Sequence, residues 1–190
     1  MSEPWMIPPA GPAAALAEGL RTACPRLETA RLVLRAPTLA DGAAYVAIYL
    51  SDRWPHDERP DAEEAWLDFN MVVASWSLRG FGAFAIEDRA TGALCGFLML
   101  DHEFGDPEPE IGWALAEGAE GRGIATEAAA AALDWARSLG LSPVAYMGTD
   151  HAASAAVARR LGGTRDAVAE AALGPGILVW RFAAAERSAR

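Results

Sequence analysis

The feature that most constrains the fold is a junction between a glycine-rich stretch and an alanine-rich one. Gly118, Gly121 and Gly123 are followed at once by the run IATEAAAAALDWARSLG, residues 124–140. Glycine disfavours helix propagation, and alanine favours it more than any other residue. The sequence therefore predicts a turn that leads into a helix over residues 122–139. Unpaired N–H groups and the helix dipole attract anions at such a helix start, so the junction is a candidate phosphate site.

Length and composition limit the class of protein. The chain has 190 residues, the size of one domain with its own hydrophobic core. Its net charge of −10 argues against nucleic acid or an anionic membrane as the main partner. No apolar run approaches the ~20 residues of a membrane helix, and no basic secretory signal begins the chain, so we expect a cytoplasmic protein. Cys24 and Cys95 lack the spacing of a metal site, and we expect no metal.

The hydrophobic pattern predicts one mixed α/β domain without internal repeats. Alternating or continuous apolar residues indicate strands, and apolar residues three or four apart indicate helices. We expect, in chain order, a strand at 31–35, a helix through Tyr45 and Tyr49, a helix at 61–79, strands on both sides of a turn at 89–92, a strand within 109–118, the helix at 122–139, a strand at 143–149, a helix within 150–163, and strands at 166–172 and 176–182.

The two ends of the chain are predicted to lie outside this domain. Residues 1–25 are rich in Pro, Ala and Gly and are expected to form a partly disordered extension, with a short helical turn near 13–20. Residues 26–184 are expected to form the domain, and residues 185–190 a tail.

Two common phosphate-binding motifs do not fit the junction. A Walker A loop requires a lysine that this stretch lacks. Gly121, Gly123 and Thr126 give Gly-x-Gly-x-x-Thr, where dinucleotide-binding folds have a third glycine and an acidic residue after the next strand. From the loop alone, an ordinary turn before a helix remains an alternative.

A wider set of segments resembles one known family. The residues EIGWALAEGAEGRGIATEAAAAALDWA are similar to the central motif of the GCN5-related N-acetyltransferases (GNAT). AASAAVARRLGG, LETARLVLRAPTLADGAAY and AIEDRATGALCGFLML resemble its RimJ/RimL-like branch, which acetylates ribosomal-protein N-termini and related acceptors. The resemblance covers most of residues 27–182. It implies an α+β fold in which a mixed sheet of about six to seven strands is flanked by about four helices, with a cleft for CoA where the fourth and fifth strands splay apart.

The resemblance also implies that acetyl-CoA is the co-substrate and that the glycine loop holds its pyrophosphate. Gly123 and Ala125 match the end of the family's Gln/Arg-x-x-Gly-x-Gly/Ala motif, whereas Glu120 stands at the Gln/Arg position. In the family, the strand before this loop carries a bulge and presents free amides to the pantetheine arm. The residues assigned to acetyl-CoA on this basis are Trp113, Ala114, Leu115, Gly121, Arg122, Gly123, Ile124, Ala125, Thr126, His151 and Ser154.

Acetyl transfer to an amine needs a base and a donor for the thioester oxygen. Glu110 is the candidate base, because a carboxylate on an apolar strand is desolvated and its pKa rises. It also matches a strand glutamate that acts as base in some members of the superfamily. A carboxylate that only ends an acidic turn, or a water relay, are the alternatives. A backbone N–H within Trp113–Leu115 is the candidate oxyanion donor.

The leaving thiolate offers weaker candidates. Ser154 matches a serine of the RimJ/RimL-like branch and is the candidate catalytic contact to the leaving group, although a serine at a helix start is also a common cap. His151 stands where the branch has Asn, and we expect it to cap the helix or to contact CoA. A catalytic base is the alternative, because the reference pKa of histidine suits that task. Gly163 stands where the branch has Phe. The tyrosine acid of other members would fall at Ala158 and is absent.

The expected function is therefore an acyltransferase that moves an acetyl group from acetyl-CoA to a primary amine in a ternary complex. The acceptor is a protein N-terminus or a small molecule, and the acidic segment DHEFGDPEPE, residues 101–110, is expected to attract a cationic one unless it is only a solvated turn. A catalytically idle CoA-binding regulator and a nucleotide-binding regulator are the alternatives. A monomer and a homodimer fit equally.

Overall fold

The computed structural model describes residues 4–52 and 60–182. The strands are β1 Leu27–Glu28, β2 Leu32–Arg35, β3 Phe84–Asp88, β4 Leu94–Asp101, β5 Glu110–Leu115, β6 Val144–Gly148, β7 Thr164–Arg165 and β8 Ile177–Arg181. The helices are α1 Gly11–Ala23, α2 Gly42–Tyr49, α3 Ala62–Arg79, α4 Ile124–Ser138, α5 Ala152–Arg160 and α6 Ala167–Leu173, with 3-10 turns η1 Pro4–Met6 and η2 Leu39–Asp41. None of the described helices is long and apolar enough to cross a membrane.

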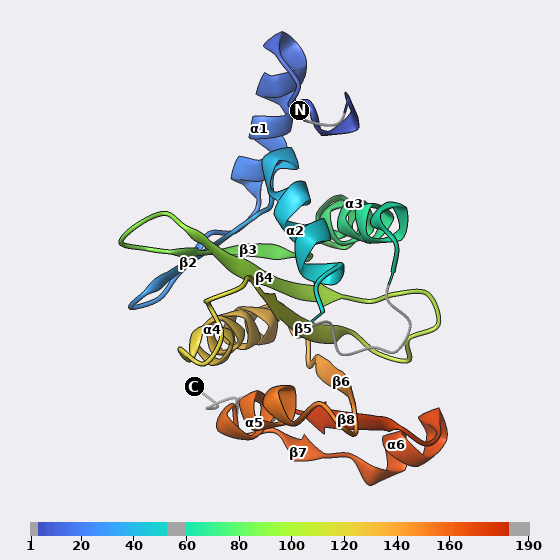
Figure 1. The fold of residues 1–190 in the computed structure, drawn as a ribbon. Coiled ribbons are helices and arrows are strands. Elements are labelled where there is room, and N and C mark those ends of the chain that lie inside the picture. Colours follow the sequence, from blue (N-terminus) through green and yellow to red (C-terminus); the bar gives the residue numbers. More distant parts are fainter. Residues whose placement is uncertain (1–3, 53–59, 183–190) are drawn as a thin grey trace.

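The described strands form one sheet in the order β1-β2-β3-β4-β5-β6-β8-β7 (Figure 1). All neighbours run antiparallel except β5 and β6. The sheet has eight strands where about six to seven were expected, because the two-residue strands β1 and β7 extend its edges. The described helices also exceed the expected four, since α1 and α6 add to them.

Two hydrophobic cores hold helices on opposite faces of the sheet. α4 covers one face, where its buried alanines pack on β2, β4 and β5. α2 and α3 cover the other face, where Tyr45 and Phe69 pack against Phe97 of β4 (Figure 1). Alanine lets α4 lie close to the strands, since it has the smallest apolar side chain. The cavity of the candidate active site lies where β5 and β6 separate.

The helix starts follow from local capping chemistry. Asp61 accepts hydrogen bonds from the amides of Glu63 and Glu64, and Glu64 bonds back to the amide of Asp61, which completes a capping box for α3. Thr38 and Asp41 form a second capping box before α2. The first box confirms the helix expected at 61–79, and the second precedes the helix expected through Tyr45 and Tyr49.

One predicted strand is wrong. Residues 166–172 form a helix, α6, instead of a strand. Asp166 caps it by accepting from the amides of Val168 and Ala169, both at 3.0 Å. The alternation of small residues that suggested a strand is equally compatible with a short, alanine-rich helix, and the cap decides the outcome.

The first end of the chain differs from the expectation. In the extension, 13 residues form α1, longer than the helical turn expected near 13–20, and none of them is buried. α1 points away from the sheet (Figure 1). The expected tail at 185–190 lies outside the described residues.

The parallel pair β5–β6 opens the sheet. These strands pair only at their first residues, Glu110 with Val144, and separate toward their carboxyl ends. The expected bulge in the strand before the loop is absent, because β4 and β5 pair in unbroken register over all of Glu110–Leu115. The register shift lies instead between β3 and β4, at Ile86/Glu87. The fourth and fifth expected strands, within 109–118 and at 143–149, are β5 and β6 in the structure, because the short β1 adds one to the count. The expected splayed cleft is therefore present between them, and the divergence of β6 frees the backbone of β5.

Candidate active site

A large cavity fills the opening between β5 and β6. Its volume is about 1420 Å³, and its lining comes from β4–β6, the loop before α4, and helices α2–α5. Ligand pockets commonly have volumes of roughly 300–1,000 Å³, so this cavity has room for two substrates. The predicted site residues that line it are Glu110, Trp113, Ala114, Leu115, Gly121, Gly123, Ile124, Ala125, Thr126, His151 and Ser154. Arg122 is not among the lining residues.

The glycine loop presents the start of α4 to the cavity. Gly121 and Gly123 have φ values of +70° and +77°, in the left-handed region that favours glycine. Gly123 is the N-cap of α4, and no side chain caps this helix. Gly123 and the first residues of α4 line the cavity, and the N-cap provides no side chain that could accept from the first amides, as suits an anion site.

The backbone of β5 provides a second set of donors. The amide of Val144 donates to the carbonyl of Pro109, at 2.9 Å, which fixes the side of β5 that faces β6. Backbone groups alternate along a strand, so the amides of Trp113 and Leu115 face this same side, where β6 has diverged. The amide of Ala114 faces β4, and its methyl group belongs to the core beneath α2 and α3.

The candidate base lies at the narrow end of the opening. Glu110 begins β5, and its Oε1 atom lies 3.8 Å from where a Cβ on Gly112 would stand. The carboxylate thus extends along the strand over a glycine that leaves it room. Burial, and the negative charges of Glu103, Asp106 and Asp101, raise the pKa of Glu110 to about 8.

More carboxylates line the same end of the cavity, on the side of α2 and α3. They are Asp68, Asp101 and Glu103. Asp101 is only 6% exposed and accepts from the Ser75 hydroxyl at 2.7 Å. Burial and the charge of Asp101 raise the pKa of Asp68, although hydrogen bonds from tyrosines oppose this. Burial also raises the pKa of Glu103.

Asp68 is held in place by a tyrosine. The hydroxyl of Tyr45 donates to Asp68 and lies 2.7 Å from the hydroxyl of Tyr49. Tyr49 and Asp68 both line the cavity. We call the group formed by Asp68, Asp101, Glu103 and Glu110 the acidic end of the cavity.

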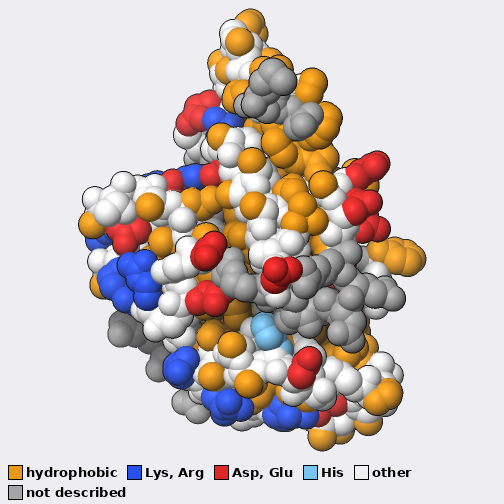
Figure 2. All heavy atoms as spheres, in the orientation of Figure 1, with side chains coloured by type: hydrophobic (Ala, Val, Ile, Leu, Met, Phe, Trp, Pro, Cys, Tyr) orange, Lys and Arg blue, Asp and Glu red, His pale blue; other side chains and the backbone are white. Residues whose placement is uncertain are grey.

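The acidic segment 101–110 does not act as one unit. Glu108 forms a bidentate ion pair with Arg181, with both oxygens 2.6 Å from guanidinium nitrogens. Its charge is therefore neutralised away from the cavity, and it is not a lining residue. Figure 2 shows the wider distribution, with acidic side chains across the centre and right of this face and basic ones along its left and lower margins.

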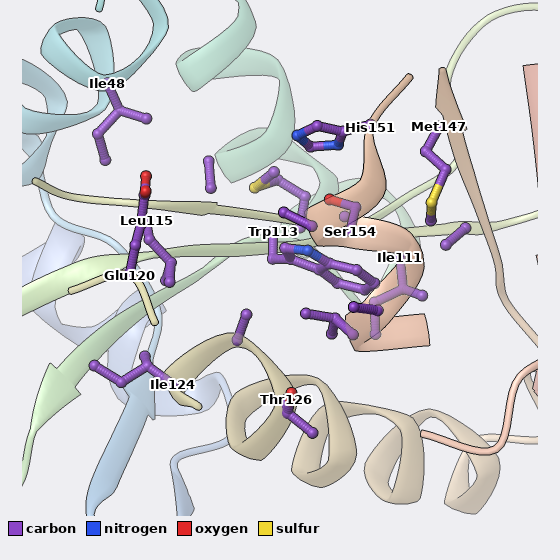
Figure 3. Close-up of a pocket in the computed structure, with 18 of the residues that line it drawn as sticks. Ile48, Ile111, Trp113, Leu115, Glu120, Ile124, Thr126, Met147, His151 and Ser154 are labelled. Atoms are coloured by element: carbon purple, nitrogen blue, oxygen red, sulfur yellow. The ribbon is translucent and has the colours of Figure 1, made fainter. Parts of the chain in front are cut away.

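His151 and Ser154 lie at the start of α5, across Trp113 from α4 (Figure 3). Ser154 is 8% exposed, and its side chain faces the cavity. His151 is the N-cap residue of α5, but its side chain makes no capping hydrogen bond, contrary to the expected capping role. Both residues line the cavity, so a ligand between α4 and α5 would lie against them.

Sequence reasoning missed a cluster behind the loop. Glu127, in the first turn of α4, accepts from the Thr29 hydroxyl at 2.6 Å and from Arg31 through its amide at 2.9 Å and its Nε at 2.7 Å. Arg31 also donates from Nη1 to the carbonyl of Arg122, at 3.0 Å. Arg31 lines the cavity. No local pattern marks it, because its partners lie more than 90 positions away in the chain.

Glu120, the departure from the motif, also lines the cavity. In the close-up, its side chain extends away from the first turn of α4 and from Thr126 (Figure 3). The carboxylate thus leaves the amides at the helix start uncovered. Within residues 4–52 and 60–182, no group of three or more His, Cys, Asp or Glu side chains is placed to hold a metal ion.

Comparison with known proteins adds to this geometry. A family model described as an acetyltransferase (GNAT) domain matches residues 31–164. An acetyltransferase from Agrobacterium tumefaciens str. C58 is 40% identical, with a TM-score of 0.78 over 84% of this chain and 94% of that chain.

Two more distant structures share the fold. The ribosomal L7/L12 α-N-protein acetyltransferase RimL, in complex with coenzyme A, is 21% identical, with a TM-score of 0.64 over 83% of this chain and 96% of that one. The ribosomal-protein-S5-alanine acetyltransferase from Vibrio fischeri is 15% identical, with a TM-score of 0.64 over 87% of this chain and 100% of that one.

Proposed function

The chain belongs to the GNAT acetyltransferase family and is an acetyl-CoA-dependent N-acetyltransferase, and on that premise we propose that it transfers the acetyl group directly to a primary amine in a ternary complex. The observation that carries this proposal is that one cavity contains both the helix start of α4 and the carboxylate of Glu110. A donor and an acceptor that enter from the two ends would meet beside β5. No covalent enzyme intermediate is then needed.

The donor end fits the shape and charge of CoA. The amides of residues 121–126 would hold the diphosphate, because they combine free N–H groups with the positive end of the α4 dipole. The pantetheine arm would lie along β5, where the amides of Trp113 and Leu115 face the opening. Ala114 would contribute only apolar contact, and Arg122 only backbone groups. His151 and Ser154 would line the other wall, on α5.

Glu110 would act as the base. An amine acceptor is protonated near neutral pH, with a reference pKa of ~10 for a lysine-like group, so a proton must leave before attack. A base works best when its pKa is close to the operating pH, and the pKa of about 8 places Glu110 there. The proton could pass directly or through one water.

The amides of β5 would stabilise the charge that develops on the thioester oxygen. A donor that is already oriented needs no reorganisation during the reaction. Trp113 N–H and Leu115 N–H are fixed by the strand pairing of β5 with β4. The indole of Trp113 packs against the α4 core, so we assign the role to its backbone alone.

The departing thiolate needs little help. The reference pKa of a thiol is ~8.5, so the thiolate is a tolerable leaving group near neutral pH. Ser154 is the group that would hydrogen-bond to it. A covalent route would need a thiol such as that of Cys95. This residue is 5% exposed within β4, and burial raises the pKa of its thiol. An acyl-cysteine route is therefore not part of the proposal.

We propose that the acceptor is cationic. The carboxylates of the acidic end surround the place where the amine must reach Glu110, and the basic residues that line the cavity, Arg31 and Arg160, lie on the loop side and on α5. Asp101 is buried, and Asp68 and Glu110 are half-buried. Carboxylates removed from water without a counter-charge are costly. A bound ammonium group would supply that charge, whether it belongs to a protein N-terminus or to a small polyamine.

The proposal includes three further points. Residues 26–184 would form the catalytic domain, the protein would be cytoplasmic, and it would act as a monomer or a homodimer. Two observations favour a second candidate, a CoA-binding regulator without activity. Ala158 is fully buried at the position where other GNAT members have a tyrosine acid, and Glu120 adds a negative charge to the donor loop.

A thiol-release assay with acetyl-CoA and a panel of acceptors tests the proposal. The panel contains peptides with free N-termini, linear polyamines, and amines of the same size without a second charge. Thiol release that depends on an amine, with preference for cationic members, is the expected result. The chain contains no lysine, so background release by self-acetylation of lysine is absent.

A thermal-shift measurement with acetyl-CoA, NAD and ATP separates the alternatives. Stabilisation by acetyl-CoA without thiol release for any amine would favour the idle regulator. Stabilisation by NAD or ATP instead would contradict both.

A further inference from the structure

The donor loop, residues 120–123 before α4, differs from the family motif in the charge of one residue. Glu120 lines the cavity where the family motif has a neutral or basic residue. Arg122, the loop's own cation, does not line the cavity, and its Nη2 lies 3.9 Å from Asp88. A diphosphate carries negative charge, so a cation beside the start of α4 would favour its binding.

Arg31 enters the same space from outside the loop. It lies in the turn before β2, and its Nη2 is 3.5 Å from where a Cβ on Gly123 would stand. Gly123 is the N-cap of α4, so the guanidinium stands beside the first amides of the helix. The Arg31 side chain is 53% exposed, which leaves it accessible to a ligand in the cavity.

Two nitrogens of the Arg31 guanidinium are anchored by hydrogen bonds, and the third is open to a ligand. A guanidinium has five N–H donors in a fixed plane. The Nε atom donates to Glu127, and Nη1 donates to the carbonyl of Arg122. Among the described residues no hydrogen-bond partner of Nη2 is present. Two anchored nitrogens fix the plane, and Nη2 lies beside Gly123, the N-cap of α4.

Glu127 is the counterpart that makes this orientation stable. Burial opposes its ionisation, but hydrogen bonds from Thr29 and from the amide and side chain of Arg31 lower the pKa of Glu127. It therefore stays ionised near neutral pH. The same carboxylate belongs to the first turn of α4, so it ties the turn before β2 to the donor loop.

We propose that Arg31 binds the diphosphate of acetyl-CoA through Nη2, the guanidinium nitrogen beside the start of α4. This rests on the proposed function, in that the loop must hold CoA. Its contribution is a charge-assisted hydrogen bond from a pre-oriented guanidinium. Arg31 is thus a binding residue for the donor and not a catalytic one.

Isothermal titration with CoA tests the proposal without an acceptor. Arg31→Gln should weaken CoA binding by roughly 10- to 100-fold, the range expected for a lost charge-assisted hydrogen bond. Arg31→Lys keeps the charge but loses the planar fork, so its affinity for CoA should lie between those of the wild type and Arg31→Gln. Unchanged affinity in both variants, with folding verified by circular dichroism, would overturn the assignment.

Two control variants separate binding from bracing. Arg89 donates to the carbonyl of Thr29 in the same turn but does not line the cavity, so Arg89→Gln should leave CoA affinity unchanged. Glu127→Gln breaks the ion pair while keeping the Arg31 charge, so it should weaken binding less than Arg31→Gln. Equal losses in Glu127→Gln and Arg31→Gln would mean that Arg31 only braces the loop, and would overturn the proposal.

A second ligand identifies the phosphate. Dephospho-CoA lacks the 3′-phosphate but keeps the diphosphate, so the ratio of affinities between wild type and Arg31→Gln should be the same for both ligands. A ratio that falls to one with dephospho-CoA would assign Arg31 to the 3′-phosphate and overturn the proposal as stated. If the wild type binds neither ligand, the proposed function itself fails; if it binds both and Arg31→Gln is equal to it, only the role of Arg31 fails.

Discussion

The cavity has a loop end, lined by the glycine loop and the start of α4, and the acidic end. The two ends attract charges of opposite sign. At the loop end, the attraction for an anion comes from backbone amides at the start of α4, with Arg31 anchored beside them by Glu127. At the acidic end it comes from side chains, the carboxylates of Asp68, Asp101, Glu103 and Glu110. A donor whose phosphate groups are invariant suits a site made by the backbone. A site made of side chains can be altered by single substitutions without disturbing the fold.

The two ends also differ in how their charges are compensated. Glu127 has three hydrogen bonds from Thr29 and Arg31, which lower its pKa. No basic side chain of the described residues forms an ion pair with Glu110, and burial with neighbouring carboxylates raises its pKa to about 8. One carboxylate therefore serves structure and stays ionised, and the other can exchange a proton near neutral pH. The substitutions below test this separation, in order of decreasing effect.

Glu110→Gln should have the largest effect. Removal of the base should lower kcat/KM for the acceptor by roughly 100-fold, the lower range for general-base catalysis. In the wild type, kcat/KM should rise with pH until about 8, as Glu110 loses its proton, and this inflection should be absent from the variant. The same acceptor is used for both enzymes, so its own ionisation cancels. A variant with unchanged kcat and pH profile would remove Glu110 from the mechanism.

The raised pKa has an opposite consequence for stability. A carboxyl group whose pKa is raised by folding stabilises the protein below its unfolded pKa, and this contribution is lost as pH rises through the folded value of about 8. Glu110→Gln should therefore be more stable than the wild type at pH 9, with a smaller difference at pH 5. Urea unfolding at the two pH values measures this. A variant less stable than wild type at pH 9 would show that the Glu110 carboxylate is compensated in the folded protein.

Gly123→Ala should weaken the binding of acetyl-CoA at the loop end and leave acceptor binding unchanged. A non-glycine residue at φ +77° costs about 1–3 kcal/mol, and relief of that strain would rotate the first amides of α4. We expect the KM for acetyl-CoA to rise roughly tenfold, with the KM for the acceptor unchanged. Gly92→Ala is the matched control, because Gly92 has φ +73° and lies in the turn between β3 and β4, outside the cavity. An equal rise in both variants would sink the assignment of the loop.

Asp68→Asn should weaken the binding of a cationic acceptor at the acidic end and leave acetyl-CoA binding unchanged. Asparagine keeps an oxygen that can accept from Tyr45, so the change removes charge with little change in shape. The KM for a diamine acceptor should rise about fivefold, the effect of one partly solvated charge pair, and the KM for acetyl-CoA should not change. Glu63→Gln, on the same helix but outside the cavity, is the control. Equal kinetics for Asp68→Asn and wild type with every cationic acceptor would contradict a cationic acceptor site.

Ser154→Ala should have the smallest effect. A thiolate with a reference pKa of ~8.5 leaves without full protonation, so we expect kcat to fall about threefold. The loss should grow as pH falls, where transfer of a proton to the leaving group matters more. Steady-state rates between pH 6 and 9 would show this. A loss of the size seen with Glu110→Gln would instead make Ser154 a principal catalytic group.

The sequence predicts the elements whose signals are local. The alanine run after Gly123 predicts α4, and apolar strands around the turn at 89–92 predict the β3–β4 hairpin, as observed. The resemblance to GNAT proteins added the cleft, which is present, and the proposal that Glu110 is the base. Local patterns are weakest where small residues alternate, which is why the pattern at 166–172 predicts a strand although Asp166 caps a helix there.

The charge pattern of the site could not be predicted from the chain. Arg31 meets Glu127 across 96 positions, and Asp68 comes to the acidic end only because α3 packs beside β4. Glu108, which belongs to the acidic segment in the sequence, is instead neutralised by Arg181, 73 positions later. Each of these contacts depends on tertiary structure, whereas spacing in the sequence reports only neighbours within one element.

The most direct test of a two-ended cavity is a crystal structure with a conjugate that links CoA to a diamine through an acetyl bridge. We expect the diphosphate on the amides of residues 121–126 with Nη2 of Arg31 beside it, the bridging amine within hydrogen-bond reach of Glu110 directly or through one water, and the second ammonium at Asp68. A conjugate bound with its diphosphate away from the start of α4, or with its amine directed away from the acidic end, would contradict a cavity that binds donor and acceptor at opposite ends.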